Sequence, residues 1–216
     1  MSTDNTYVIA DLHGRYDLLD KALSLIPKKS KIVFTGDYID RGPDSYKVVD
    51  RLMVGQYEKK NWICLRGNHE QMMIDSYIYP DNEYVWRMNG GDATLKSYPK
   101  DDADVALEHH TEWMDQLPYY HEDKHRVYVH AYLEPEVPLR KQNKESMIWN
   151  RYGKNEHYGW MDKHVVHGHT PHKEGPLIYK GRTNMDTAAV YTGRLVVGVF
   201  DDNVAGGPVD LIEVVL

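Results

Sequence analysis

The sequence predicts an α/β protein with helices on the faces of its sheet, because a strand, a loop and a helix follow one another three times. Short, mainly apolar segments at residues 7–10, 31–35 and 61–65 are expected to be strands, and each precedes a polar loop and then apolar residues at helical spacing. The chain has 216 residues, which is the length of one domain with a modest addition. We therefore expect a single domain over residues 1–216.

The rest of the chain continues the mixed pattern. The first helix ends before Pro27, and the second is expected to end near Gly55. Residues 80–118 are expected to form a small helical cap, broken at Asn89-Gly90-Gly91. Further strands are expected, and they lie at residues 126–129, 163–166, 195–200 and 209–215.

Composition excludes several classes of protein. Hydrophobic residues make up 41% of the chain and charged residues 27%, as in ordinary globular proteins. The net charge of −7 and the lack of a Lys/Arg cluster argue against a nucleic-acid partner. A single cysteine, Cys64, indicates a reducing compartment. No apolar run reaches 18 residues and the first residues do not resemble a signal, so we expect a cytoplasmic protein without a membrane span; its oligomeric state is left open.

The polar residues that follow the predicted strands carry the chemistry. Because ligands bind at the carboxyl ends of strands in such sheets, these side chains are expected to converge. Two aspartates, one asparagine and three histidines form a mixed oxygen and nitrogen donor set, which suits Mn²⁺, Fe or Zn²⁺ better than Ca²⁺ or Mg²⁺. Six ligands exceed what one ion can use together with water and substrate, so two ions are expected. The six candidates are Asp11, His13, Asp37, Asn68, His130 and His169.

These residues lie in motifs that resemble a known family. The order and spacing of the motifs are similar to those of the phosphoprotein phosphatase branch of the calcineurin-like metallophosphoesterases, from residue 6 to about residue 200. The segments His69 to Asp75 and Trp149-Asn150-Arg151 resemble more narrowly the lambda phage protein phosphatase and its bacterial relatives. The motifs are Asp11-Leu12-His13-Gly14, Gly36-Asp37-Tyr38-Ile39-Asp40-Arg41-Gly42, Gly67-Asn68-His69-Glu70, His130-Ala131 and Gly168-His169-Thr170-Pro171.

The resemblance implies a four-layer fold, with a central β-sandwich of mixed sheets flanked by helices. It also implies two divalent ions, with Mn²⁺ expected and Fe or Zn²⁺ as alternatives. Asp11 and His13 would hold the first ion and Asp37 would bridge the two. The ligands of the second ion would be Asn68, His130 and His169.

The resemblance further implies which residues act on the substrate. His69 would protonate the leaving group, and Asp40 would orient it and raise its pKa. Arg41 and Arg151 would grip the phosphate, with Asn68 beside them. Attack would come directly from a hydroxide that the two ions share. Of the other histidines, which are expected at the surface or in supporting positions, His167 alone lies on the same strand face as a ligand.

These features together predict a metal-dependent serine/threonine protein phosphatase that hydrolyses phosphate monoesters, with phosphotyrosine as a further substrate. Its partner would be a phosphoprotein or phosphopeptide. One alternative is a symmetric dinucleoside tetraphosphate hydrolase, which shares the metal motifs. A second alternative is a phosphate-binding regulatory module without turnover, although that module would not need His69 and Asp40.

Overall fold

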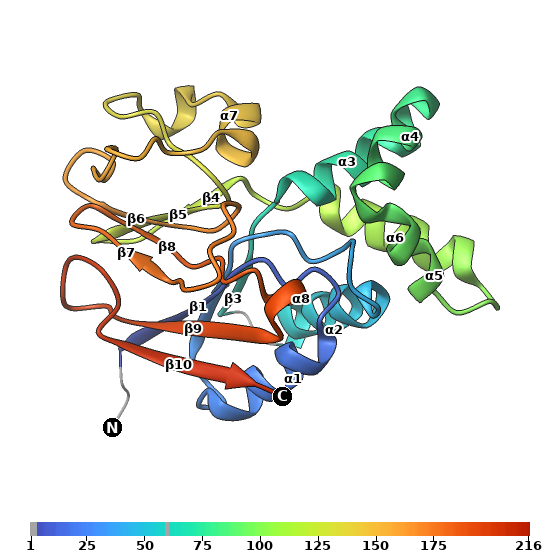
Figure 1. Cartoon of the computed structure of the whole chain (residues 1–216), viewed down its shortest axis with the longest axis horizontal. Coiled ribbons are helices and arrows are strands. Elements are labelled where there is room, and N and C mark those ends of the chain that lie inside the picture. The colour runs from blue at the N-terminus through green and yellow to red at the C-terminus, as the bar shows by residue number, and fades with distance from the viewer. Residues whose placement is uncertain (1–3, 59–60) are drawn as a thin grey trace.

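Two mixed five-stranded sheets stack face to face in the computed structural model, which describes residues 4–58 and 61–216 (Figure 1). The first sheet has the order β10-β9-β1-β2-β3, and β1, β2 and β3 run parallel. The second has the order β4-β5-β6-β8-β7, and β5, β6 and β8 run parallel. The strands are β1 (Asn5–Ile9), β2 (Lys31–Phe34), β3 (Trp62–Cys64), β4 (Tyr120–Glu122), β5 (Arg126–Val129), β6 (His164–His167), β7 (Leu177–Ile178), β8 (Arg182–Asn184), β9 (Arg194–Asp201) and β10 (Asp210–Val215).

Helices cover the outer faces of both sheets. Apolar residues of α1, α2, α3 and α6 pack against the first sheet, and α7 packs against the second. The four-layer sandwich expected from the sequence is thereby confirmed. The helical segments are α1 (Tyr16–Leu25), α2 (Ser45–Glu58), α3 (Asn68–Ile78), η1 (Pro80–Asn82), α4 (Glu83–Trp86), η2 (Arg87–Gly91), α5 (Asp92–Ser97), α6 (Ala103–Asp115), η3 (Leu139–Lys141), α7 (Lys144–Trp149) and α8 (Ala189–Thr192).

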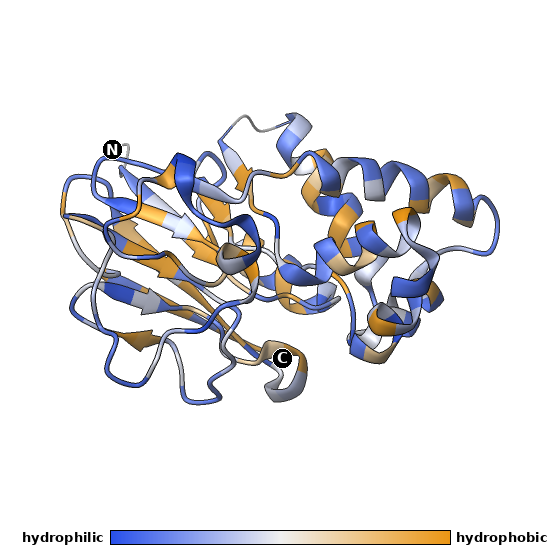
Figure 2. Cartoon of the chain, turned by 90° about the horizontal axis from the view of Figure 1, so that it is seen from above, coloured by the Kyte–Doolittle hydropathy of each residue, from blue (hydrophilic) through white to orange (hydrophobic). Residues whose placement is uncertain are grey.

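Alternation along the strands explains the two cores. In β1, Tyr7 and Ile9 face the helices while Val8 faces the other sheet. In β5, Tyr128 faces the first sheet and its neighbours Val127 and Val129 face α7. Successive side chains of a strand point to opposite faces, so strands that are apolar throughout are buried between two layers. Figure 2 shows the hydrophobic residues gathered along these strands.

The cap predicted over residues 80–118 is helical and lies to one side of the sheets (Figure 1). At Gly90 the chain takes a left-handed conformation, with φ 110°, inside the π-helical turn η2, so the expected break is a local turn between helical pieces. Within the described residues, no helix has both the length and the apolar character needed to cross a bilayer.

Some boundaries differ from the sequence prediction. Gly55 lies inside α2 rather than at its end, because a Cβ there would lie 2.1 Å from the ring of Trp62 and only glycine allows this close packing. The short elements β4, β7, β8, η3, α7 and α8 were not predicted. They have two to six residues each, which is too short for a periodic pattern to emerge.

Candidate metal centre

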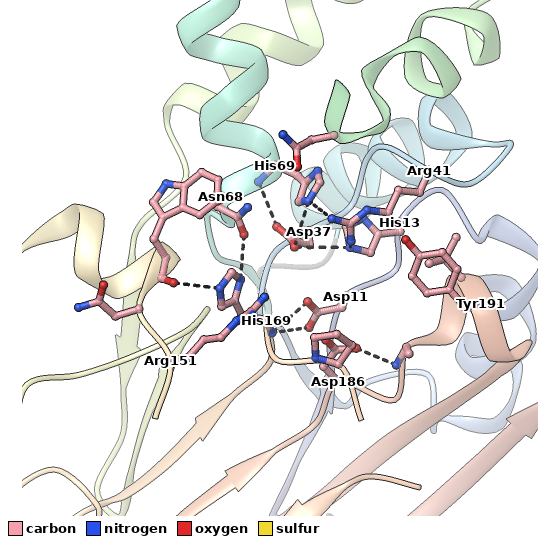
Figure 3. Close-up of a pocket in the computed structure, with 16 residues that line it drawn as sticks. Asp11, His13, Asp37, Arg41, Asn68, His69, Arg151, His169, Asp186 and Tyr191 are labelled. Carbon is pink, nitrogen blue, oxygen red and sulfur yellow. Dashed lines mark hydrogen bonds and ion pairs between the residues drawn. The ribbon is translucent and has the colours of Figure 1, made fainter. Parts of the chain in front are cut away.

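The parallel strands of both sheets deliver polar side chains to one cavity of about 550 Å³ (Figure 3). Asp11 and Asp37 follow β1 and β2, and Asn68 begins α3 after β3. His169 follows β6 of the second sheet and faces the same cavity. His130 follows β5 and is buried beside Asp37, so residues distant in sequence meet at one edge of the sandwich.

Asp37 lies at the centre of two clusters of candidate ligands. His13, Asp37 and His69 form the first, and Asp37, His130 and His169 form the second; within each, the ligand atoms lie within 4.8 Å of one another. Oδ2 of Asp37 is 3.5 Å from Nε2 of His13, while Oδ1 is 3.4 Å from Nε2 of His130. One carboxylate therefore offers an oxygen to each side, which is the arrangement of a bridging ligand.

Backbone carbonyls orient the three histidines expected to bind metal. Nδ1 of His13 donates to the carbonyl of Ile39 at 2.8 Å, and Nδ1 of His130 donates to that of Thr35 at 2.9 Å. Nε2 of His169 donates to the carbonyl of Trp149 at 3.0 Å. In each case the other ring nitrogen carries a lone pair, because a neutral imidazole has a single proton. Such carbonyl bonds orient metal-binding histidines.

The lone pairs of the second cluster converge without a proton between them. Oδ1 of Asn68 lies 3.0 Å from Nε2 of His130 and 3.0 Å from Nδ1 of His169. Burial lowers the pKa of both histidines, that of His169 to about 3, so both rings are neutral at pH 7. Three acceptors that face one another repel, and a cation between them would bind all three. The donor set therefore fits a divalent metal ion.

Buried carboxylates add negative charge to the cavity. Burial, together with Asp186 and Asp37, raises the pKa of Asp11 well above its usual range. Burial also raises the pKa of Asp186 to about 7. Asp11 stands outside the two close clusters, but it lines the same cavity and both its oxygens accept from the backbone N–H of His169. A cation in the cavity would favour the ionised form of these groups.

The loops that carry these residues have an unusual backbone. Left-handed φ angles of 42–73° occur at non-glycine residues of the site, and such strained conformations persist only where neighbouring contacts hold them. Gly168 allows one close approach, because a Cβ there would lie 1.9 Å from Oδ2 of Asp11. The left-handed residues are Asp11, His13, Asp37, Asp40, Arg41 and His169.

His69 has a different environment from the other histidines of the cavity. Its Nδ1 donates to Oδ2 of Asp40 at 2.6 Å, and its Nε2 accepts from Nη2 of Arg41 at 2.9 Å. Burial lowers the pKa of His69, but Asp37 and the bond to Asp40 outweigh burial and hold it above its usual value. This histidine is therefore the one best able to carry a second proton near neutral pH.

Two arginines face the cavity. Arg41 donates to Nε2 of His13 at 2.8 Å and also contacts His69. Its guanidinium therefore contacts two of the three residues in the first cluster of candidate ligands. Arg151 is exposed at the cavity wall, and its charge helps to lower the pKa of His169. The structure thus brings all ten sequence-predicted residues to one region.

The cavity is also lined by residues to which the sequence alone assigned no role, although Trp149 lies in one of the quoted motifs. Asp186 follows β8 as the predicted ligands follow their strands, so the same signal could have found it. Trp149 and Tyr191 also line the cavity and are partly exposed, at 40% and 67%. No periodic pattern marks either residue. His167, the histidine reconsidered from its strand face, is buried outside the cluster, where its Nε2 accepts from Arg182 at 3.1 Å.

Comparison with known proteins agrees with this geometry. Residues 5–200 match the family model described as calcineurin-like phosphoesterase. The chain is 28% identical over 207 residues to "Serine/threonine-protein phosphatase 1" of Salmonella typhimurium, covering 88% of this chain and 89% of that protein. It is 26% identical over 219 residues to "Bis(5'-nucleosyl)-tetraphosphatase PrpE [asymmetrical]" of Bacillus cereus, covering 87% of each.

Solved structures share the fold. A serine/threonine phosphatase from Saccharomyces cerevisiae, similar to human phosphatase PP5, aligns with a TM-score of 0.73 at 14% identity, covering 100% of this chain and 81% of that chain. A cold-active protein-tyrosine phosphatase of a Shewanella species aligns with a TM-score of 0.67 at 17% identity, covering 98% and 78%. At these identities the likeness concerns the fold.

Proposed function

Since this chain belongs to the calcineurin-like phosphoesterase family, we propose that it is a metal-dependent serine/threonine protein phosphatase. Phosphotyrosine is a further proposed substrate. Family membership identifies the chain as a phosphoesterase, and the proposal concerns which phosphate ester it hydrolyses. The proposed partner is a phosphoprotein or phosphopeptide that presents its phosphate to the cavity of Figure 3.

The observation that carries the proposal is the pair formed by His69 and Asp40 beside the ligand clusters. Hydrolysis of a phosphoserine releases an alkoxide, which is a poor leaving group and needs a proton as the P–O bond breaks. Hydrolysis of a dinucleoside tetraphosphate releases a nucleotide anion, which leaves without a proton. A buried histidine whose pKa is raised, with its Nε2 facing the cavity, therefore favours the phosphate monoester.

We propose two divalent ions as cofactors, held by the side chains that the sequence pattern singled out. Asp11, His13 and Asp37 would hold the first, and Asp37 would share the second with Asn68, His130 and His169. When bound, such ions lower the pKa of water towards 7 and offset charge on the phosphoryl oxygens. The mixed donor set suits Mn²⁺, Fe or Zn²⁺ better than Ca²⁺ or Mg²⁺, and of these we propose Mn²⁺, with Fe and Zn²⁺ as alternatives.

The protein's own residues bind, orient and protonate. Arg41, Arg151 and Asn68 line the cavity, and all three would donate to the phosphoryl oxygens. Water adds to phosphorus as the P–O bond to the substrate breaks. With Arg41 turned from Nε2 of His69 to the phosphoryl oxygens, His69 protonated at Nε2 gives that proton to the leaving oxygen, so that an alcohol and inorganic phosphate result. Asp40 holds the opposite nitrogen of His69 throughout and stabilises its protonated form.

A second candidate is hydrolysis of a dinucleoside tetraphosphate. The similarity to the Bacillus protein, which is named as a bis(5'-nucleosyl)-tetraphosphatase, supports it. That name specifies the asymmetrical reaction, whereas the alternative expected from the sequence is the symmetrical one. Trp149 and Tyr191 line the cavity and expose parts of their rings, and either ring could stack on a nucleotide base. This candidate predicts a strong preference for the dinucleotide.

Purified, Mn²⁺-loaded protein would be offered a phosphoserine peptide, para-nitrophenyl phosphate and diadenosine tetraphosphate at equal concentration. We expect kcat/KM to be highest for the peptide, with release of inorganic phosphate. A higher value for the dinucleotide would replace the proposal with the second candidate. No turnover of any of the three would favour the phosphate-binding module. Asp37→Asn serves as the control for contaminating phosphatases.

A further inference from the structure

We propose that Trp86 and Thr94, two buried residues of the cap, are positioning residues for the pair formed by His69 and Asp40. The cap segment from α4 to α5 would then be a working part of the active site rather than only a cover. This inference rests on the proposed function, because it concerns the proton that His69 gives to the leaving group.

Asp40 is fully buried. Among the residues that the structure describes, three side chains donate to its carboxylate, and two of them belong to the cap. Nε1 of Trp86 lies 3.0 Å from Oδ1 and 3.1 Å from Oδ2. Oγ1 of Thr94 donates to Oδ1 at 2.7 Å, and Nδ1 of His69 donates to Oδ2 at 2.6 Å. The carboxylate plane is thus held from one side by the cap and from the other by the histidine that it orients.

The cap also holds the backbone of the same loop. The N–H of Asp40 donates to Oγ1 of Thr94 at 2.8 Å, so this hydroxyl both accepts from and donates to one residue. The N–H of Arg41 donates to the carbonyl of Gly90 at 3.3 Å. Both loop residues have left-handed φ angles, of 73° and 69°, which cost energy unless neighbouring contacts hold them.

Glycines bring the cap close enough to make these contacts. A Cβ at Gly90 would lie 2.7 Å from the backbone nitrogen of Arg41. A Cβ at Gly91 would lie 2.7 Å from the indole of Trp86, so the ring packs directly on the turn that precedes Thr94. The turn η2 therefore wraps the loop of Asp40 and Arg41 without an intervening side chain.

The consequence for the reaction is geometric. A general acid acts only when its proton lies within hydrogen-bond reach of the leaving oxygen, and a displacement of about 1 Å can cost about 100-fold in rate. Without the cap donors, Asp40 could rotate away and His69 would lose its fixed orientation. A substrate whose leaving group needs no proton would be little affected.

Two conservative variants test the inference. Trp86→Phe removes the indole N–H and keeps a buried ring, and Thr94→Val removes the hydroxyl at nearly constant volume. We expect kcat for a phosphoserine peptide to fall about 10- to 100-fold in each, and kcat for para-nitrophenyl phosphate, whose leaving group is stable as an anion, to fall less than about threefold. Matched controls are Trp113→Phe and Thr111→Val, which remove similar hydrogen bonds to Gln56 and Leu107.

His69→Asn separates the two hypotheses. His69→Asn could lower kcat for the peptide selectively while Trp86→Phe and Thr94→Val do not. In that case the positioning role of the cap is wrong, and the role of His69 as the general acid is kept. If His69→Asn lowers kcat equally for both substrates, His69 is not the general acid, and the positioning role that depends on it is wrong as well. In the double variant of His69→Asn with Thr94→Val, we expect no additional loss, because both changes remove the same proton delivery.

An NMR measurement without turnover completes the test. In the metal-free protein, the imidazole ¹H–¹⁵N spectrum should show a slowly exchanging Nδ1 proton for His69, since Asp40 holds it in a buried bond. Thr94→Val and Trp86→Phe should broaden or shift this signal, while Thr111→Val should not. An unchanged signal in both cap variants would overturn the proposal. Should Trp86→Phe fail to fold, Thr94→Val decides alone by the same two readouts.

Discussion

Oδ1 of Asn68 lies 3.0 Å from Nδ1 of His169, although the two residues follow strands of different sheets. Because Nε2 of His169 donates to the carbonyl of Trp149, the contact joins an amide oxygen to a nitrogen lone pair. The edge of the sandwich thus holds two acceptors against each other. Because these two acceptors repel each other, a cation bound between them would relieve the repulsion. The first two predictions below concern the binding of such a cation.

Replacement of His169 should weaken metal binding. We expect His169→Ala to lower the affinity for Mn²⁺ at one of two sites by at least about tenfold, because a ligand is lost where three acceptors converge. Isothermal titration of metal-depleted protein measures this directly. His172→Ala is the matched control, since His172 is exposed and lies outside the described clusters. Equal affinities in the two variants would contradict the assignment of His169.

Replacement of Asp11 should stabilise the metal-free protein. Burial and two neighbouring carboxylates raise the pKa of Asp11, so its ionised form is unfavourable in the folded state at pH 7. Asp11→Asn removes that charge and should raise the Tm measured in a chelator. Mn²⁺ at about 100 times the Kd of a site should stabilise the wild type by about 2.7 kcal/mol for each ion bound, and the variant should lose most of the gain from the ion that Asp11 would hold. A lower Tm in chelator for the variant would contradict the electrostatic argument.

Arg151 should contribute to substrate binding more than to folding. It is exposed at the cavity wall, so Arg151→Gln should leave Tm unchanged while lowering kcat/KM for a phosphopeptide about tenfold or more, through loss of a charged hydrogen-bond donor. Arg140→Gln is the control, because Arg140 is exposed and absent from the cavity lining. Steady-state kinetics measure kcat/KM for both variants. Equal values for Arg151→Gln and Arg140→Gln would show that the assignment of Arg151 is wrong.

His110 should make stability depend on pH. It packs among Tyr98 and Tyr46, and burial lowers its pKa to about 4, from 6.5. As pH falls, His110 binds a proton in the unfolded chain before it does so in the folded protein. The contribution of His110 to stability is therefore fully present above pH 6.5 and is lost as pH falls towards 4. The free energy of unfolding should be measured with urea at pH 7 and at pH 5. Its decrease between pH 7 and pH 5 should be about 2 kcal/mol smaller for His110→Gln than for the wild type. Equal losses would contradict this.

Much of the fold was readable from residue patterns. The expected strands at residues 31–35 and 126–129 each contain three consecutive apolar residues, at 32–34 and 127–129, because both faces of β2 and β5 are covered there, and runs of this kind identify buried strands. The candidate ligands were readable for a related reason. A polar residue directly after a buried strand, such as Asp11 or Asp37, stands out against its neighbours.

The contacts of the cap were not readable in this way. Trp86 lies in a helix of four residues and Thr94 in one of six, and neither marks a motif. Their donation to Asp40 arises because η2 turns the chain back over the loop at Gly90. Contacts of this kind depend on the path of the backbone, which local propensity does not specify.

The sequence by itself determined which chemical groups are present, the strands that carry them and the family to which they belong. Only the tertiary structure decided that Asp37 faces His13 with one oxygen and His130 with the other, and that His69 turns to Asp40. The physical reason is that periodicity records which face of an element is buried. Distances between side chains are set by the stacking of two sheets and by left-handed turns between them, and these arise only when the whole chain packs.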